Sequence, residues 1–139
     1  PEGETVSGNE GSLTLLVSYG AFDALLTGDL EGKGETEAAE LAGQCDYLKV
    51  AHHGSKNSTG EQFLEATAPK ICVISAPERS LYGHPHPEVL ERLENAGGDW
   101  YQTGPDGAVT AEVRGGEVLV TGYRRNVAID EKVVYTGEE

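Results

Sequence analysis

Methionine is absent from this sequence of 139 residues, even at its first position, and cysteine occurs only twice. The missing methionine predicts that the chain begins inside a longer reading frame. Cys45 and Cys72 are far apart and form no Cys-x-x-Cys pair, which argues against a cysteine-rich zinc site. Each adjoins an apolar segment, so buried free thiols are favoured, and a disulfide stays open as the alternative.

Long hydrophobic runs are also missing. No apolar stretch approaches the roughly 20 residues that cross a bilayer, and nothing resembles a signal peptide, so we expect no membrane contact by this chain itself. Basic residues are scarce, with 10 Lys and Arg against 24 Asp and Glu, for a net charge of -14. Such a surface repels nucleic acid unless the contact is local or mediated by a metal.

Glycine, by contrast, is abundant at 19 residues, which predicts many turns and short elements. The length predicts one domain or part of one. Short apolar runs separated by helical patterns predict an α/β fold with a mixed sheet. We expect strands over residues 12–18, 21–27, 46–51, 71–75, 99–102, 108–114 and 117–122, with helices over 35–41, 60–66 and 87–96.

All four histidines lie in two loops, each after a short apolar strand. His52 and His53 follow one predicted strand, His84 and His86 follow the next, and Asp29 lies just past an earlier one. Loops at the carboxyl ends of neighbouring parallel strands converge, so we expect Asp29, the histidine pair and His84 to share one cleft. Imidazole and carboxylate are metal ligands and proton-transfer groups.

A structural role is the alternative for each of these residues. One ring of the histidine pair could be a hydrogen-bonded turn residue and the other a surface residue. Asp29 could cap the next helix or form a turn. His86 stands between two prolines at the start of the helix predicted over 87–96, and we assign it a mainly structural role.

Three longer motifs carry a resemblance to a known family. In their order and spacing they resemble the second half of the metallo-β-lactamase-like domain of the ComEC family, which are bacterial DNA-uptake channels. The resemblance extends from Asn9, which with Ser12 opens the first hairpin, to about Arg114. The motifs are LLTGDLE at residues 25–31, DYLKVAHHGSKNS at 46–58 and YGHPHPEVLERL at 82–93.

The resemblance implies a four-layer αββα fold, of which this chain is the second half. We expect a flexible opening segment at residues 1–11, the half-domain at 12–135 and a disordered tail at 136–139. One half exposes a sheet face that normally packs on the other, so the expected partners are the missing N-terminal half or a second copy in a homodimer. The family also implies single-stranded DNA as a partner through the parent protein, on the extracellular or periplasmic face of a bacterial membrane.

The implied site holds a divalent metal, usually two zinc ions, with manganese as the alternative, and activates water to attack a phosphodiester or another ester. By position, Asp29 would bridge the metals, because a carboxylate offers two oxygens. One of His52 and His53 would be the late histidine ligand, with His53 favoured. The other, His52, would support the metal ligands or assist proton transfer. Three residues would line the substrate cleft, namely Ser55, Ser58 and His84. Of these, His84 would hydrogen-bond a phosphate oxygen or the leaving group.

The sequence also departs from the family. No histidine precedes His52, so the HxHxDH-type cluster that supplies most zinc ligands is absent, and two ligands remain where a site needs three or four. Pro77 and Ser80 stand where the family has glycine and asparagine. We therefore expect part of a metal-dependent hydrolase or nuclease-like domain that is weakly active or inactive alone. It would hold a divalent metal in the complete domain, with no metal in this fragment as the alternative. The alternatives are a non-catalytic interaction module, or a hydrolase of another phosphoester or a thioester.

Overall fold

The computed structural model describes residues 8–124 and 127–135 of the chain. Strands and helices alternate through most of it, and three consecutive strands follow at its end. In chain order the elements are η1 (Gly8–Gly11), β1 (Leu15–Tyr19), β2 (Phe22–Leu26), α1 (Lys33–Ala42), β3 (Tyr47–Lys49), η2 (Ala51–Gly54), α2 (Glu61–Thr67), β4 (Ile71–Ile74), α3 (Pro87–Ala96), β5 (Asp99–Gln102), α4 (Thr103–Asp106), β6 (Val109–Arg114), β7 (Glu117–Arg124) and β8 (Val127–Tyr135).

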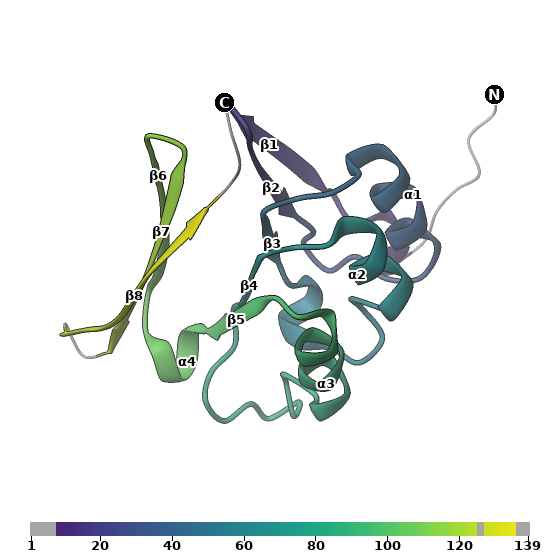
Figure 1. Ribbon diagram of the computed structural model, residues 1–139. Helices are drawn as coiled ribbons and strands as arrows, with labels where there is room; N and C mark the ends of the chain where they lie inside the picture. The colour runs from purple at the N-terminus through teal and green to yellow at the C-terminus, as the bar shows by residue number, and fades with distance from the viewer. Residues whose placement is uncertain (1–7, 125–126, 136–139) are drawn as a thin grey trace.

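A five-stranded sheet in the order β1-β2-β3-β4-β5 forms the centre of the molecule (Figure 1). Strands β1 and β2 form an antiparallel hairpin, and every other neighbouring pair is parallel. All four residues of β4 are buried, as is typical of a strand that is covered on both faces. The mixed α/β sheet predicted from the sequence is therefore confirmed, including its first hairpin.

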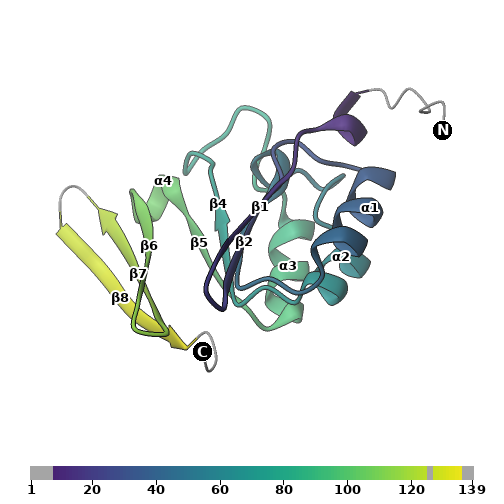
Figure 2. The same cartoon turned by 90° about the horizontal axis from the view of Figure 1, so that it is seen from above.

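Helices α1, α2 and α3 cover one face of this sheet (Figures 1 and 2). In α3, Pro87 takes the first helical turn and Gly97 ends the helix with a left-handed φ of 80°, the residue types that favour these positions. Val89 and Leu93 are buried at helical spacing, and pack with the sheet into one core. In the described part of the chain, no helix is long and apolar enough to cross a membrane.

The second sheet, in the order β6-β7-β8, lies on the opposite side of the central sheet from the helices (Figure 2). Ile71, Val73 and Tyr101 of the central sheet form a second core with Val118 and Val120 of β7. The expectation that the half-domain leaves a sheet face exposed therefore needs correction, because part of that face is covered by this chain's own final strands. The layers are helix, sheet and sheet.

Strand β1 differs from the other strands of the central sheet, because all five of its residues are exposed. It lies at the edge of the sheet, so one side of its backbone has no neighbouring strand among the described residues. The exposed side chains include Leu15, Leu16, Val17 and Tyr19. An apolar edge strand of this kind is a ready site for pairing with another strand.

The boundaries differ slightly from those expected. Gly8–Gly11 form the 3₁₀ turn η1, so ordered structure begins inside the segment that we expected to be flexible. Residues 103–106, between two of the predicted strands, form the short helix α4, where the Asp106 carboxylate accepts the Gln102 backbone N–H at 2.8 Å. The predicted tail at residues 136–139 lies outside the described residues.

Cys45 and Cys72 are both buried and free, which confirms the prediction that they are buried free thiols. Burial raises the pKa of each thiol to about 12. Both side chains lie in the core between the helices and the sheet, where a small apolar side chain packs well.

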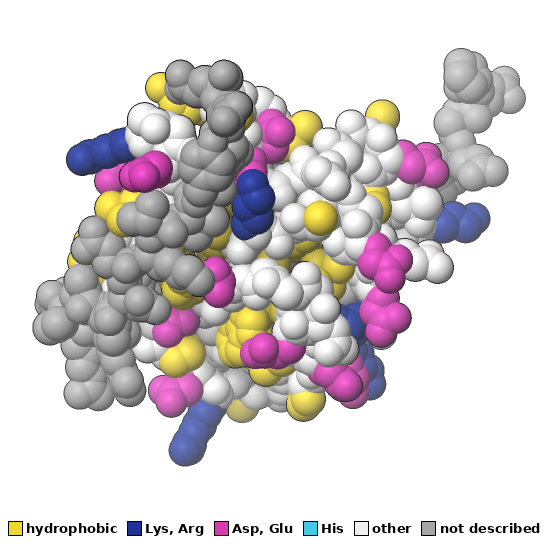
Figure 3. Space-filling model, viewed as in Figure 1, with side chains coloured by type: hydrophobic (Ala, Val, Ile, Leu, Met, Phe, Trp, Pro, Cys, Tyr) yellow, Lys and Arg dark blue, Asp and Glu magenta, His cyan; other side chains and the backbone are white. Residues whose placement is uncertain are grey.

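Charge is not concentrated on the face drawn in Figure 3. Acidic and basic side chains are both scattered over that face. None of the described histidines is visible on it, so the histidine-bearing loops open elsewhere on the molecule.

Candidate functional site

The candidate site lies where β2, β3 and β4 end. The backbone N–H of His52 donates to the Gly28 carbonyl at 2.9 Å, and that of Val50 donates to the Val73 carbonyl at 2.9 Å. These bonds hold the loop after β3 between the ends of its two neighbours. The carboxyl ends of the parallel strands thus deliver the candidate residues to one edge of the sheet, as the topology of such sheets requires.

The four histidine rings form one continuous cluster. The ring centroid of His52 lies 6.3 Å from that of His53 and 5.6 Å from that of His84. His84 is in turn 4.7 Å from His86. The sequence placed His86 in the same loop as His84, but its residue pattern did not indicate that this ring would join the cluster.

The backbone at the histidine pair is unusual. His52 has φ 48° and ψ 46°, and His53 has φ 55° and ψ 23°, so two successive non-glycine residues adopt the left-handed conformation. That conformation costs roughly 1–2 kcal/mol per residue and concentrates at functional sites. Gly54 follows with φ 82°, and a Cβ there would lie 2.6 Å from the Cβ of Pro85. The surrounding packing therefore holds the strained pair in place.

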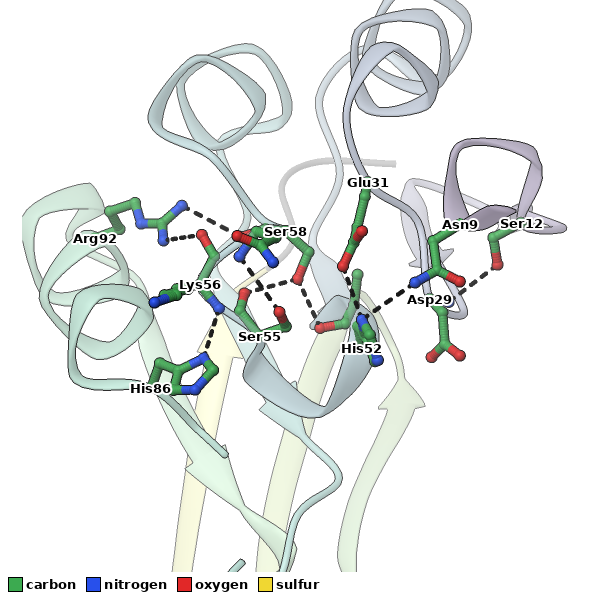
Figure 4. Close-up of polar contacts among 12 residues, drawn as sticks. Asn9, Ser12, Asp29, Glu31, His52, Ser55, Lys56, Ser58, His86 and Arg92 are labelled. Carbon is green, nitrogen blue, oxygen red and sulfur yellow. Dashed lines mark hydrogen bonds and ion pairs between the residues drawn. The ribbon is translucent and has the colours of Figure 1, made fainter. Parts of the chain in front are cut away.

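His52 is oriented by a carboxylate. Its Nδ1 lies 2.8 Å from Glu31 Oε1 and 3.4 Å from the Asn9 amide nitrogen (Figure 4). An ionised carboxylate only accepts hydrogen bonds, so His52 donates from Nδ1 and keeps a lone pair on Nε2. Glu31 was missed as a site residue. The available signal was its position in the LLTGDLE motif, two residues after Asp29.

His53 has the same tautomer for a different reason. Its Nδ1 lies 2.7 Å from the backbone carbonyl oxygen of Ser75, which can only accept, so the ring donates from Nδ1. The lone pair on Nε2 remains available. A histidine that donates its other ring N–H to a carbonyl or carboxylate is the usual arrangement at metal sites, and both His52 and His53 have it.

Asp29 lies at the same edge, and its carboxylate is exposed beside His52 (Figure 4). The backbone N–H of Asp29 donates to Ser12 Oγ at 3.0 Å. Gly28 has φ 55°, and a Cβ there would lie 2.6 Å from Ser12 Oγ, so a glycine is needed for this turn. Burial lowers the pKa of Lys49, and the charge of Asp29 opposes that shift, which puts this lysine within electrostatic reach of the site.

The second histidine loop is tied to the first. The backbone N–H of His86 donates to the Gly54 carbonyl at 2.9 Å, and the ring Nδ1 of His86 accepts the Lys56 N–H at 2.9 Å. Neutral His86 therefore carries its ring proton on Nε2 and is a hydrogen-bond donor there. Burial and the neighbouring rings of His86, His52 and His53 lower the pKa of His84.

Two expected cleft residues need correction. Ser55 and Ser58 are buried, Ser58 being only 1% exposed. The Ser58 hydroxyl lies 2.9 Å from the Ser55 carbonyl and 3.1 Å from the Ala51 carbonyl, and Ser55 Oγ accepts the Asn57 N–H at 3.3 Å. Both hydroxyls satisfy the backbone of a tightly wound loop, so neither faces a substrate.

A residue from α3 completes the support of this loop. The Arg92 guanidinium donates to the backbone carbonyls of Lys56, Ser58 and Thr59 at 2.8, 3.2 and 3.2 Å (Figure 4). Sequence reasoning placed Arg92 inside the YGHPHPEVLERL motif but gave it no role. Its contacts cross more than 30 residues of chain, which no local pattern reveals.

The donor set fits part of a metal shell. Asp29 offers exposed carboxylate oxygens, and the fixed tautomer of His53 leaves Nε2 free to bind, which are ligands that zinc accepts. Within residues 8–124 and 127–135, however, no group of three or more His, Cys, Asp or Glu side chains is arranged to hold a metal ion. The described chain therefore supplies some of the ligands that a site needs and not a complete set.

Comparison with known proteins gives three informative relatives. ComE operon protein 3 of Bacillus subtilis is 44% identical over 93 residues, which are 66% of this chain and 12% of that protein. Recombination protein 2 of Haemophilus influenzae is 42% identical over 89 residues, 64% of this chain and 11% of that protein. Competence protein ComA of Neisseria gonorrhoeae is 34% identical over 111 residues, 78% of this chain and 16% of that protein.

No family model matches the chain. The chain spans only between 11% and 16% of the length of these three relatives. Their likeness therefore concerns one segment of much longer proteins.

Proposed function

This chain is a homologue of a segment of the ComEC-family competence proteins, and from that premise we propose that it forms part of a metal-dependent phosphodiester hydrolase domain in bacterial DNA uptake. From the sequence resemblance we also propose single-stranded DNA as a partner through the parent protein, and the extracellular or periplasmic face of the membrane as the place of action. With an incomplete ligand set, the segment alone would be weakly active or inactive.

One observation carries the proposal. His52 and His53 both donate from Nδ1, to Glu31 at 2.8 Å and to the Ser75 carbonyl at 2.7 Å, and both keep Nε2 free at the edge where Asp29 is exposed. Simple structural histidines do not need a strained backbone and a fixed tautomer at two successive positions. The arrangement suits residues that bind a metal or accept a proton.

Each residue has a distinct task in this proposal. Asp29 and His53 would hold a divalent metal, zinc or manganese, which when bound makes water nucleophilic near neutral pH. His52 accepts a proton at Nε2, and the Glu31 carboxylate stabilises the positive charge that the ring then carries. His86 donates from Nε2 toward a phosphate oxygen, and His84 would hydrogen-bond a phosphate oxygen or the leaving group.

Metal content tests the proposal. The purified chain would be incubated with zinc or manganese, desalted and subjected to elemental analysis, beside Asp29→Ala and His53→Ala. Glu37→Ala is the matched control, since Glu37 is exposed on α1. We expect metal to be retained by the chain and the control, with a second copy of the chain supplying the remaining ligands, and to be lost from both site variants.

Two outcomes would contradict this proposal. A chain that stays metal-free after incubation would favour a non-catalytic interaction module with the same fold. Retention of metal by both site variants would place any metal elsewhere. Where metal is retained as expected, a preference for bis(p-nitrophenyl) phosphate over p-nitrophenyl acetate distinguishes a phosphodiester from a carboxylic ester substrate.

A further inference from the structure

The loop between β4 and α3 presents two large apolar side chains to solvent beside the histidine cluster. Leu81 is fully exposed and Tyr82 is 81% exposed. A single exposed aromatic residue is unremarkable on most surfaces. Here its position is informative, because the Tyr82 ring lies 6.0 Å from the ring of His84 at an interplanar angle of 33°. The phenol is thus the outermost member of a row of rings that continues inward through His84 to His52.

Hydrogen bonds hold the tip of this loop in place. Ser80 organises it, because its carbonyl accepts the Gly83 N–H and its hydroxyl accepts the Tyr82 N–H, both at 3.1 Å. At the base of the loop, His86 is bonded to the backbone of Gly54 and of Lys56. The backbone of Tyr82 is therefore held in a defined position, which reduces the conformational entropy that ordering the loop on binding would cost.

The charge of the protein limits how it can hold a polynucleotide. At a net charge of -14, general electrostatic attraction cannot supply the affinity, since phosphate contacts normally draw on many basic residues. Near the histidines the exposed basic side chains include Lys56 and Arg79, which suffice for a local contact only. Stacking of a base on an aromatic ring is independent of the protein's net charge and tolerant of sequence.

We infer that Tyr82 is a stacking platform for an unpaired nucleobase of a polynucleotide whose adjoining phosphate lies at the histidine cluster. The inference rests on the proposed phosphodiester function and adds a residue that would hold a base of the strand. Bases within a duplex are already stacked on both faces, so the substrate is a single strand or a frayed end. Tyr82 then positions the strand, while the N–H of His86 faces the phosphate.

Binding of labelled oligonucleotides by fluorescence anisotropy, at low salt and without metal, tests this inference. The probes are a short oligothymidylate and an abasic oligomer of the same length, which has the phosphates but no bases. The variants are Tyr82→Ala, Tyr82→Phe, which retains a ring, and Tyr19→Ala. Tyr19 is the matched control because it is also exposed, at 71%, but lies on β1.

We expect the unmodified chain to prefer oligothymidylate over the abasic oligomer. Tyr82→Ala should weaken oligothymidylate binding by roughly tenfold and remove the preference, whereas Tyr82→Phe and Tyr19→Ala should remain within about twofold of the unmodified chain. Equal binding of the two probes by the unmodified chain, no binding at all, or no effect of Tyr82→Ala would each overturn the inference.

Base stacking can be separated both from metal binding and from contact with a membrane. The stacking measurement needs no metal. If the chain failed to bind metal in the elemental analysis, the proposed function would be overturned, and the preference for bases would still be measured independently. Leu81 and Tyr82 could instead enter a lipid surface. Co-sedimentation with phosphatidylcholine vesicles that is lost in Leu81→Ser and Tyr82→Ala would overturn the inference in favour of a membrane contact.

Discussion

The Nδ1 nitrogen of His53 lies 2.7 Å from the carbonyl oxygen of Ser75, so the end of β4 fixes the ring of a residue that follows β3. This bond joins two loops that are adjacent only because their strands pair in parallel. It also holds His53 in a left-handed backbone conformation, φ 55° and ψ 23°, that residues other than glycine adopt at a cost.

That conformation leads to a prediction about His53→Gly and His53→Ala. Both variants lose the ring and its hydrogen bond, so they differ mainly in backbone preference. Glycine adopts a positive φ without strain, and we expect His53→Gly to be more stable than His53→Ala by about 1 kcal/mol. Urea denaturation measures both. At the exposed helical position Glu37 the order should reverse, with alanine more stable than glycine. If the alanine variant were also the more stable one at position 53, His53 would not be left-handed in solution.

Arg92→Met is expected to destabilise the protein by roughly 2–3 kcal/mol, because it leaves the backbone carbonyls of Lys56, Ser58 and Thr59 without their charged donor. Amide hydrogen exchange in residues 55–60 should accelerate in the same variant. Arg114→Met is the control, since Arg114 is exposed and pairs only with its neighbour Glu112 among the described contacts; its effect should be within about 0.5 kcal/mol. Equal effects of the two substitutions would contradict the role assigned to Arg92.

Much of the fold could be predicted because its signals are local. The helix over residues 87–96 was predicted to its last residue, since proline and glycine bracket an apolar stripe. The strands predicted over residues 108–114 and 117–122 correspond to β6 and β7, which pair as a hairpin across Gly115 and Gly116. Convergence of the loops at one edge followed from the rule that governs the carboxyl ends of parallel strands.

The remainder depends on contacts that no local pattern encodes. Ser55 and Ser58 belong to a polar loop, and only the way that loop winds shows that their hydroxyls turn inward. Glu31 reaches His52 across 21 residues of chain. The coverage of the central sheet by β7 depends on the packing of Val118 and Val120 against β4 and β5. The Glu31 contact and the packing of β7 are long-range relationships, whereas the contacts of Ser55 and Ser58 are local and depend on how their own loop winds.

Glu35 should make the stability of the protein depend on pH. Burial raises the pKa of its carboxyl above the ordinary value, although the backbone N–H groups of Gly60 and Thr59 and the charge of Arg92 act in the opposite direction. The folded state therefore keeps this proton to a higher pH than the unfolded state does. The resulting stabilisation is complete below the unfolded pKa of about 4.3 and is lost as the pH rises through the folded pKa.

Glu35→Gln removes this titration. We expect the free energy of unfolding of the variant, relative to that of the unmodified protein, to increase as the pH rises from about 4 toward neutrality. Urea denaturation at several pH values measures the difference, with Glu37→Gln as the exposed control. A constant difference across this pH range would contradict the assigned shift.

The two thiols should be unreactive until the protein unfolds. Cys45 and Cys72 are buried, with pKa values raised to about 12, so little reactive thiolate forms at neutral pH. We expect DTNB to modify neither thiol in the folded protein and both in denaturant. Rapid modification of a folded thiol would contradict the burial, and an absence of thiols after unfolding would indicate a disulfide.

Strand β1 should drive association. Its five residues are all exposed and it lies at the edge of the sheet, so its backbone can pair with the same strand of a second copy, while Leu15 and Val17 supply apolar contacts. We expect sedimentation to detect a dimer whose fraction rises with concentration. Val17→Lys should shift the equilibrium toward monomer, because a lysine on an edge strand opposes such pairing. Thr36→Lys, on the exposed surface of α1, adds the same charge elsewhere and should leave the dimer intact. A chain that remains monomeric at all concentrations would show that β1 needs a different strand as its partner.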